Sequence, residues 1–249
     1  MKKVFSLFSL AVLSGVILAG CSKFDNDDNG NNAAAGLMAF NLATDQSQVG
    51  TSIGGNYITS VPLGYSHYTG GYLAVFPGSR TVESSDVSSA ARLAAASFDF
   101  ENQKYYSTFL VGADGNYQQL IVKDSIDSLP GTGEAYVRFI NAIPDSSVSQ
   151  VRLAVNGANR LEESSRYTQI SSFTAMSPGE LAVNISNGTD IDASRTITIE
   201  ARKIYTLLLI GTPGATANGV EIKFVQNGTT EAEQNGGRMA AAVRVKTAE

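Results

Sequence analysis

Residues 203–211 read KIYTLLLIG and residues 104–112 read KYYSTFLVG, at an offset of 99 positions. Earlier in the chain, YVRFINAIPD at 136–145 pairs with GLMAFNLATD at 36–45, at an offset of 100. Between these blocks, ELAV at 180–183 pairs with YLAV at 72–75. Three blocks in the same order and at nearly one spacing indicate a tandem duplication of units of about 90 residues.

The apolar runs inside each unit are short and rich in β-branched and aromatic residues, which is typical of strands. TITIE at 196–200 alternates with period two, as in a half-buried strand, whereas residues 205–210 form a continuous apolar run that predicts a central strand. Asp114-Gly115 between two such runs indicates a hairpin. The predicted fold class is all-β, with two tandem β-sandwiches of immunoglobulin-like or prealbumin-like type and about seven strands each.

The alanine-rich residues 85–97 leave open a helix of one or two turns before a strand at 98–100. Asn184, Asn187 and Asn227 lie in N-x-Ser/Thr triplets and are interpreted as turn residues.

The chain divides by composition into six predicted segments. They are a lipoprotein signal peptide (1–20), a lipidated cysteine and disordered tether (21–34), a first sandwich (35–123), a linker (124–133), a second sandwich (134–226) and a C-terminal tail (227–249) with an extra edge strand at about 239–245.

The composition excludes several classes of protein. A single cysteine permits no intrachain disulfide framework, and a single histidine, His67, permits no two-histidine metal site. A formal net charge of −5 argues against a nucleic-acid partner, which would need a basic face. We therefore expect no metal, no cofactor and no nucleic acid.

The first residues have the pattern of an export signal. Lys2 and Lys3 precede an uncharged apolar stretch over residues 4–18, which suits a signal-peptide core and is short for a membrane span. It ends at Leu18-Ala19-Gly20-Cys21, which resembles the bacterial lipobox. That resemblance implies cleavage before Cys21, acylation of Cys21 and a membrane partner. The alternative is a plain secretory signal followed by a free thiol.

Residues 136–157, YVRFINAIPDSSVSQVRLAVNG, resemble the DUF4397 family, whose members open with a strand, an A-x-P-D turn and a V-x-V-x-x-G strand. The resemblance covers residues 134–226 well and residues 35–123 less well, because Thr44 stands where Pro144 does and the second strand is hard to see. The family implies an exported protein, often a lipoprotein with paired β-sandwich domains. It carries no established activity, so it implies no catalytic residues.

Two further resemblances point to lipoproteins of the Bacteroidetes type. The acidic residues after Cys21 resemble the surface-export signal of such lipoproteins, and both membrane faces stay open. Asp124-Ser125-Ile126 and Asp127-Ser128-Leu129 resemble their three-residue O-glycosylation motif, which makes Ser125 and Ser128 candidate modification sites. The resemblance implies a lipid-anchored outer-membrane location, on the periplasmic face or at the cell surface.

No assembled catalytic constellation is readable. Residues 50–54, GTSIG, match a nucleophile elbow but lack a preceding strand and a following helix, and we interpret them as a glycine-rich loop. Tyr65, Tyr68 and Tyr72 are candidate ligand-facing aromatics, against the alternative that they pack in the core.

The expected function is a non-catalytic binding or structural module that presents sandwich loops to an envelope protein or a glycan, and not an enzyme. The alternatives are an accessory subunit of an outer-membrane assembly and, less favoured, a surface hydrolase acting on glycans or peptides.

Overall fold

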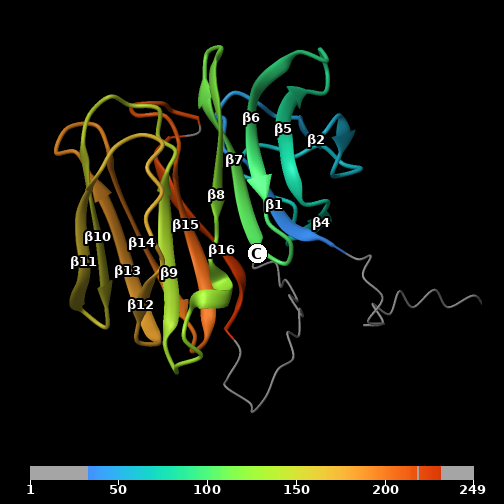
Figure 1. Cartoon of the computed structure of the whole chain (residues 1–249). Coiled ribbons are helices and arrows are strands. Elements are labelled where there is room, and N and C mark those ends of the chain that lie inside the picture. Colours follow the sequence, from blue (N-terminus) through green and yellow to red (C-terminus); the bar gives the residue numbers. More distant parts are fainter. Residues whose placement is uncertain (1–32, 218, 231–249) are drawn as a thin grey trace, which may run out of the picture. The chain divides into compact units, whose positions relative to one another are not determined.

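The computed structural model describes residues 33–217 and 219–230, and this part of the chain is all-β (Figure 1). The first sandwich contains eight strands in two four-stranded sheets, ordered β4-β1-β7-β8 and β3-β2-β5-β6. The strands are β1 (Ala35–Asn41), β2 (Val49–Ile53), β3 (Asn56–Tyr57), β4 (Leu73–Val75), β5 (Gly78–Asp86), β6 (Arg92–Phe100), β7 (Tyr105–Ala113) and β8 (Asn116–Lys123).

The second sandwich repeats this plan strand for strand. Its sheets are ordered β12-β9-β15-β16 and β11-β10-β13-β14. The strands are β9 (Ala135–Asn141), β10 (Ser149–Val155), β11 (Ala158–Ser165), β12 (Thr174–Met176), β13 (Gly179–Ser186), β14 (Asp192–Ile199), β15 (Lys203–Ile210) and β16 (Glu221–Thr229). The predicted class of two tandem β-sandwiches is therefore confirmed.

Each sandwich has one parallel pair of strands, β1 with β7 and β9 with β15, at the centre of a sheet. All four strands are buried along almost their whole length. A strand that is buried on both faces carries a continuous apolar run. This explains why two of the three sequence repeats that indicated the duplication are these central strands. The third pairing is wrong, because residues 72–75 reach the edge strand β4, whose equivalent is β12, whereas residues 180–183 lie in β13, the equivalent of β5.

One face of each central strand packs inside its own sandwich. In the second sandwich Val137, Phe139, Leu207 and Leu209 join one continuous core with the residues of the facing sheet. In the first sandwich the core consists of two smaller clusters, one around Leu37 and Phe100 and one around Val49 and Leu110.

The other face of the central strands in each sandwich contacts the other sandwich. A fourth cluster, the joint cluster, combines buried residues of both sandwiches: Met38, Phe40, Leu42, Phe109, Val111, Ile140, Ala142, Leu208, Ile210 and Val225. Each fully buried side chain of this size stabilises the fold by about 1.5–3 kcal/mol relative to exposure. The two sandwiches therefore share a hydrophobic interface, and the linker does not merely tether them.

Several local expectations are confirmed. Asp114 and Gly115 form the β7–β8 hairpin turn, both with positive φ (51° and 80°), as a type I′ turn requires. Ile197 and Ile199 face the core from β14, and residues 205–210 lie in the central strand β15.

Other expectations are wrong. Residues 85–97 form no helix: β5 ends at Asp86, a turn follows, and β6 begins at Arg92, so pairing with β5 overrides the helical propensity of the alanines. Residues 50–53 are not a loop but part of β2, which is the missing second strand, and Gly54-Gly55 form its turn. Asn184 and Asn227 lie in strands β13 and β16, not in turns.

The linker is also more ordered than an extended spacer. Residues Ile126–Ser128 form a 3₁₀ turn, η1. Asp124, the first residue of the linker, is buried, with 1% of its surface exposed. The linker thus contributes a buried charged group to the fold.

Candidate functional site

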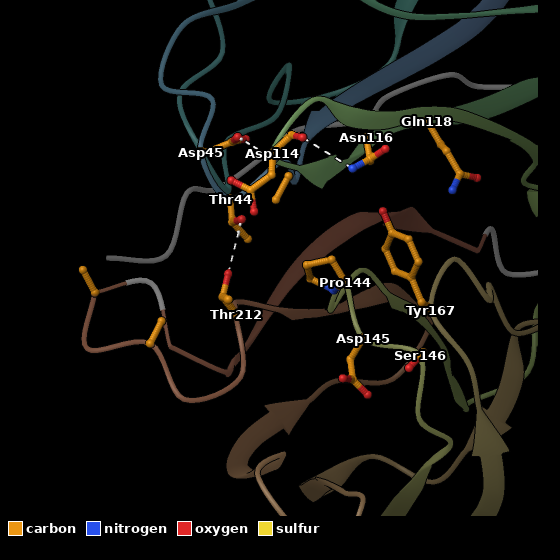
Figure 2. Close-up of a pocket in the computed structure, with 13 residues that line it drawn as sticks. Thr44, Asp45, Asp114, Asn116, Gln118, Pro144, Asp145, Ser146, Tyr167 and Thr212 are labelled. Atoms are coloured by element: carbon orange, nitrogen blue, oxygen red, sulfur yellow. Dashed lines mark hydrogen bonds between the residues drawn. The ribbon is translucent and has the colours of Figure 1, made fainter.

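A groove of about 630 Å³ lies where turns of both sandwiches meet (Figure 2). This volume falls in the range typical of ligand sites, about 300–1,000 Å³. The groove is lined by Thr44, Asp45, Ala113, Asp114, Asn116, Gln118, Pro144, Asp145, Ser146, Tyr167, Thr212, Ala215 and Ala217. The first sandwich provides its β1–β2 turn and the β7–β8 hairpin. The second provides its β9–β10 turn, the β15–β16 loop and Tyr167 from the β11–β12 loop.

Two equivalent asparagines shape the turns that border the groove. The Oδ1 atom of Asn41, at the end of β1, accepts a hydrogen bond from the N–H of Ala43 at 3.1 Å. The Oδ1 atom of Asn141, at the end of β9, accepts one from the N–H of Ile143 at 3.2 Å. Such local side-chain bonds stabilise a tight turn. The turn after Asn41 places Asp45 in the lining of the groove, and the turn after Asn141 places Asp145 there.

The aspartates are fixed by further hydrogen bonds. Asp45 Oδ2 accepts from the backbone N–H of Asp114 at 2.9 Å and from the hydroxyl of Tyr117 at 2.7 Å. Asp145 Oδ1 accepts from the N–H of Ser147 at 2.7 Å. The bond to the Asp45 carboxylate helps to raise the pKa of Tyr117 above its ordinary value, after burial of the phenol as the larger cause.

The charged side chains that line the groove are all acidic. Its lining contains the carboxylates of Asp45, Asp114 and Asp145 and no lysine, arginine or histidine. Within residues 33–217 and 219–230, no three His, Cys, Asp or Glu side chains gather closely enough to hold a metal ion. The groove is therefore suited to hydrogen-bond donors and positively charged groups spread over an extended ligand.

The sequence analysis identified none of the residues that line this groove, and Tyr167 is the one aromatic side chain among them. Figure 2 shows its hydroxyl end directed toward Asn116 and Gln118 of the opposite wall. The hydroxyl is buried without a hydrogen-bond partner, and burial raises the pKa of Tyr167 above its ordinary value. Tyr167 corresponds to Tyr65, because each precedes a residue with positive φ, Thr168 or Ser66. Aligning the two repeats through this segment would have shown this equivalence, but not that Tyr167 lines the groove, because Tyr65 does not.

The three predicted ligand-facing tyrosines pack against the joint cluster and do not line the groove. The ring of Tyr68 stacks on Phe40 with 5.4 Å between centroids. The Tyr65 hydroxyl is buried without a partner, and burial raises its pKa. The Tyr72 hydroxyl donates to Asp124 Oδ2. Ligand binding by these side chains stays a prediction.

Both candidate glycosylation sites are exposed. Ser125 has a left-handed backbone (φ 48°), and its carbonyl accepts a hydrogen bond from the Ser128 hydroxyl at 2.7 Å. Modification of either serine stays a prediction. Leu18, Ala19, Gly20 and Cys21, and the edge strand expected in the tail, lie outside the described residues.

Among those described residues, no helix combines the length and the apolar character that a bilayer span needs.

Fold and groove together define a protein built from two β-sandwich repeats with an acidic groove at their joint. Residues 31–148 and 135–245 each match the family described as "Domain of unknown function (DUF4397)". The chain belongs to this family and contains it in two tandem copies, as the sequence analysis predicted. This membership fits the expectation of a non-catalytic surface or structural module.

The comparison with curated proteins gives no match. Among solved structures, the chain is similar to the tip fimbrial protein Mfa3 from Porphyromonas gingivalis with C-terminal truncation. The identity is 9%, the TM-score is 0.26, and the match covers 78% of this chain and 99% of that one.

Proposed function

We propose that the protein is an envelope lipoprotein of the outer membrane, anchored by an acylated Cys21. Its paired sandwiches then serve as a non-catalytic binding module whose contact surface is the acidic groove. The observation that carries the proposal is the groove itself, because its walls come from equivalent turns of two repeats that are fixed to each other by a shared core.

The chemistry of the lining supports binding rather than turnover. Asp45 accepts hydrogen bonds from the neighbouring β7–β8 hairpin, and Asp145 accepts one from its own turn, so each is held as a fixed acceptor. Fixed carboxylates on opposite sides of the groove complement a partner that presents amines, guanidinium groups or hydroxyls.

The anchor is tested by replacing Cys21 with Ser in the intact chain. We expect the protein to move from the membrane to the soluble fraction and to lose fatty-acid labelling. Ser22→Ala, one residue further on, is the matched control and should stay in the membrane fraction. Membrane retention and labelling of the Cys21→Ser chain would refute the anchor.

The groove is tested by crosslinked pull-down from intact cells, paired with protease shaving to identify the exposed membrane face. Asp114→Asn with Asp145→Asn should remove the captured partner, whereas Asp99→Asn with Asp192→Asn, outside the groove lining, should retain it. Equal capture by both double variants would mean that another surface binds.

An accessory subunit of an outer-membrane assembly is the alternative role. In that case a stable multiprotein complex should be isolated from membranes both with the parent chain and with the Asp114→Asn, Asp145→Asn variant.

A further inference from the structure

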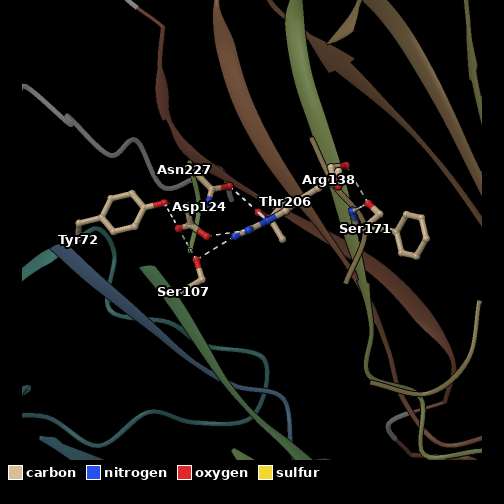
Figure 3. Close-up of polar contacts among 9 residues, drawn as sticks. Tyr72, Ser107, Asp124, Arg138, Ser171, Thr206 and Asn227 are labelled. Atoms are coloured by element: carbon tan, nitrogen blue, oxygen red, sulfur yellow. Dashed lines mark hydrogen bonds and ion pairs between the residues drawn. The ribbon is translucent and has the colours of Figure 1, made fainter. Parts of the chain in front are cut away.

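A buried ion pair crosses the joint between the sandwiches (Figure 3). Arg138 on β9 of the second sandwich places its guanidinium 2.7 Å from Asp124 Oδ1, at the end of the first sandwich. The side chains are 2% and 0% exposed. Burial of two charges requires close pairing and further hydrogen bonds, since the desolvation cost is otherwise not offset.

Those further bonds come from both sandwiches. Arg138 donates from Nε to Thr206 Oγ1 at 3.0 Å and from an Nη atom to Ser107 Oγ at 2.9 Å. The Ser107 hydroxyl donates to Asp124 Oδ2 at 2.8 Å, and the Tyr72 hydroxyl donates to the same oxygen. The guanidinium also lies over the ring of Phe173, 4.5 Å from its centroid.

The polar groups at this joint occupy equivalent positions in the two repeats. Ser107 on β7 corresponds to Thr206 on β15 at the offset of 99. The Ser107 hydroxyl donates to Asp124, and the Thr206 hydroxyl donates to Asn227 Oδ1 at 2.6 Å. Asp124 and Asn227 are therefore equivalent positions. Asp124 accepts a hydrogen bond from Ser107 of the first repeat, and Asn227 accepts one from Thr206 of the second.

The charges break this symmetry. Arg138 corresponds to Met38 at the offset of 100. The first sandwich therefore brings Met38 and Asp124 to the joint, and the second brings Arg138 and Asn227. Each carries one charge, and the charges have opposite signs.

The apolar part of the joint does not distinguish the repeats in this way. Phe40 corresponds to Ile140, Leu42 to Ala142, Phe109 to Leu208 and Val111 to Ile210, and all lie in the joint cluster. A face built from equivalent apolar positions is self-complementary in the manner of a two-fold interface. By hydrophobicity alone, a sandwich could pack on the same sandwich of another chain.

We propose that the Arg138–Asp124 pair decides which sandwiches join, so that a first sandwich packs only on a second one. Two second sandwiches would bury two arginines against neutral asparagines, and two first sandwiches would bury two aspartates against methionines. Each like pairing leaves buried charges without a counterion, which is the repulsive element that specificity requires. The inference is independent of the membrane anchor and of any ligand in the groove.

The test uses the complete chain with Cys21→Ser, so that no acyl chain affects the hydrodynamic mass. Arg138→Met with Asp124→Asn removes both charges and makes the two faces alike. After refolding at high concentration, we expect this variant to form a dimer of doubled mass by light scattering, whereas the parent chain refolds as a monomer. Ile210→Val, which removes one methylene from the joint cluster, is the matched control and should stay monomeric.

A monomeric double variant, an equal dimer fraction in Ile210→Val, or a parent chain that already dimerises would each overturn the proposal. If the neutral variant does not fold, Met38→Arg with Asn227→Asp gives each sandwich both charges and should also dimerise. Failure of both variants to fold would mean that the pair is needed for folding itself, and the proposal would be wrong.

Discussion

The two sandwiches share one strand plan but distribute their buried residues differently. The second sandwich has a continuous core across both sheets, whereas the core of the first is divided into two smaller clusters. Both contribute equally to the joint cluster. The same strand plan can therefore be stabilised mainly by its own core, as in the second sandwich, or partly by packing against a neighbouring sandwich, as in the first.

The largest expected effect concerns the charge that only the second sandwich carries. Arg138→Met, which introduces the residue found at the equivalent position 38, leaves Asp124 buried without a counterion. We expect a loss of about 3–5 kcal/mol in the free energy of unfolding, measured in urea. Arg152→Met breaks the exposed pair with Glu162 and should cost less than about 1 kcal/mol. Similar losses in both variants would contradict the central role of the joint.

The second prediction sharpens the comparison of the cores. Phe139→Ala in the continuous core should cost about 3–5 kcal/mol, and Phe100→Ala in the first sandwich should fall at the lower end of that range. The neighbouring Phe98 is only half-buried and packs against Phe100, so that site can relax into the cavity. Denaturant unfolding of both variants tests the order, and a larger loss for Phe100→Ala would reverse the comparison.

The third prediction concerns a glycine with positive φ that both sandwiches have near the end of a central strand. Gly112 ends the long β7 run with φ 127°, and Gly211 has φ 112° at the equivalent place. A Cβ at Gly112 would overlap the backbone carbonyl oxygen of Asn116, whereas Gly115 (φ 80°) has open space around it. Gly112→Ala should therefore cost about 1–3 kcal/mol more than Gly115→Ala. Equal melting temperatures for the two variants would count against the close approach.

The fourth prediction compares three tyrosines that pack against the joint cluster, two of which should give the smallest effects. Tyr72→Phe removes a hydrogen bond to the Asp124 carboxylate and should cost about 1.5–3 kcal/mol. Tyr65→Phe and Tyr167→Phe remove hydroxyls that have no partner, so stability at neutral pH should stay unchanged or rise slightly. Urea unfolding at pH 7 checks both, and a large loss for Tyr65→Phe would reveal an unseen partner.

The same tyrosines determine how the stability of the folded chain changes at alkaline pH. Burial raises the pKa of Tyr65, Tyr72 and Tyr167 in the folded chain above the ordinary value of 10.0, and the Asp124 carboxylate raises that of Tyr72 further. Below pH 10 both states keep the proton, so no stability is lost. Above it the unfolded chain ionises first, and stability falls as pH rises. Tyr65→Phe should flatten this fall in unfolding experiments above pH 10.

Prediction from sequence succeeded where one residue pattern decided one local structure. The central strands, the Asp114-Gly115 turn and the duplication followed from apolar runs and turn chemistry. The edge strands β3, β4, β11 and β12 were not identified, and the expected number of about seven strands in each sandwich is one fewer than the eight observed. Runs of two or three residues at β3, β4 and β12 have too little periodicity to be recognised.

The groove and the joint could not be predicted because both depend on how two sheets meet. Arg138 looks like an exposed residue in a strand, and Asp124 looks like part of a polar linker. Their burial follows from packing between segments of different repeats. The hydroxyls of Tyr106 and Tyr205, at equivalent positions of the two repeats, accept hydrogen bonds from the backbone N–H groups of Glu101 and Glu200, and no sequence pattern indicated these bonds.

The direction of β1 separates the start of the described chain from the groove. The chain enters the first sandwich at Ala35, runs along β1 to Asn41, and only then reaches Thr44 and Asp45. Seven residues of extended strand span roughly 23 Å. The described chain therefore begins at the end of β1 that lies opposite the acidic groove.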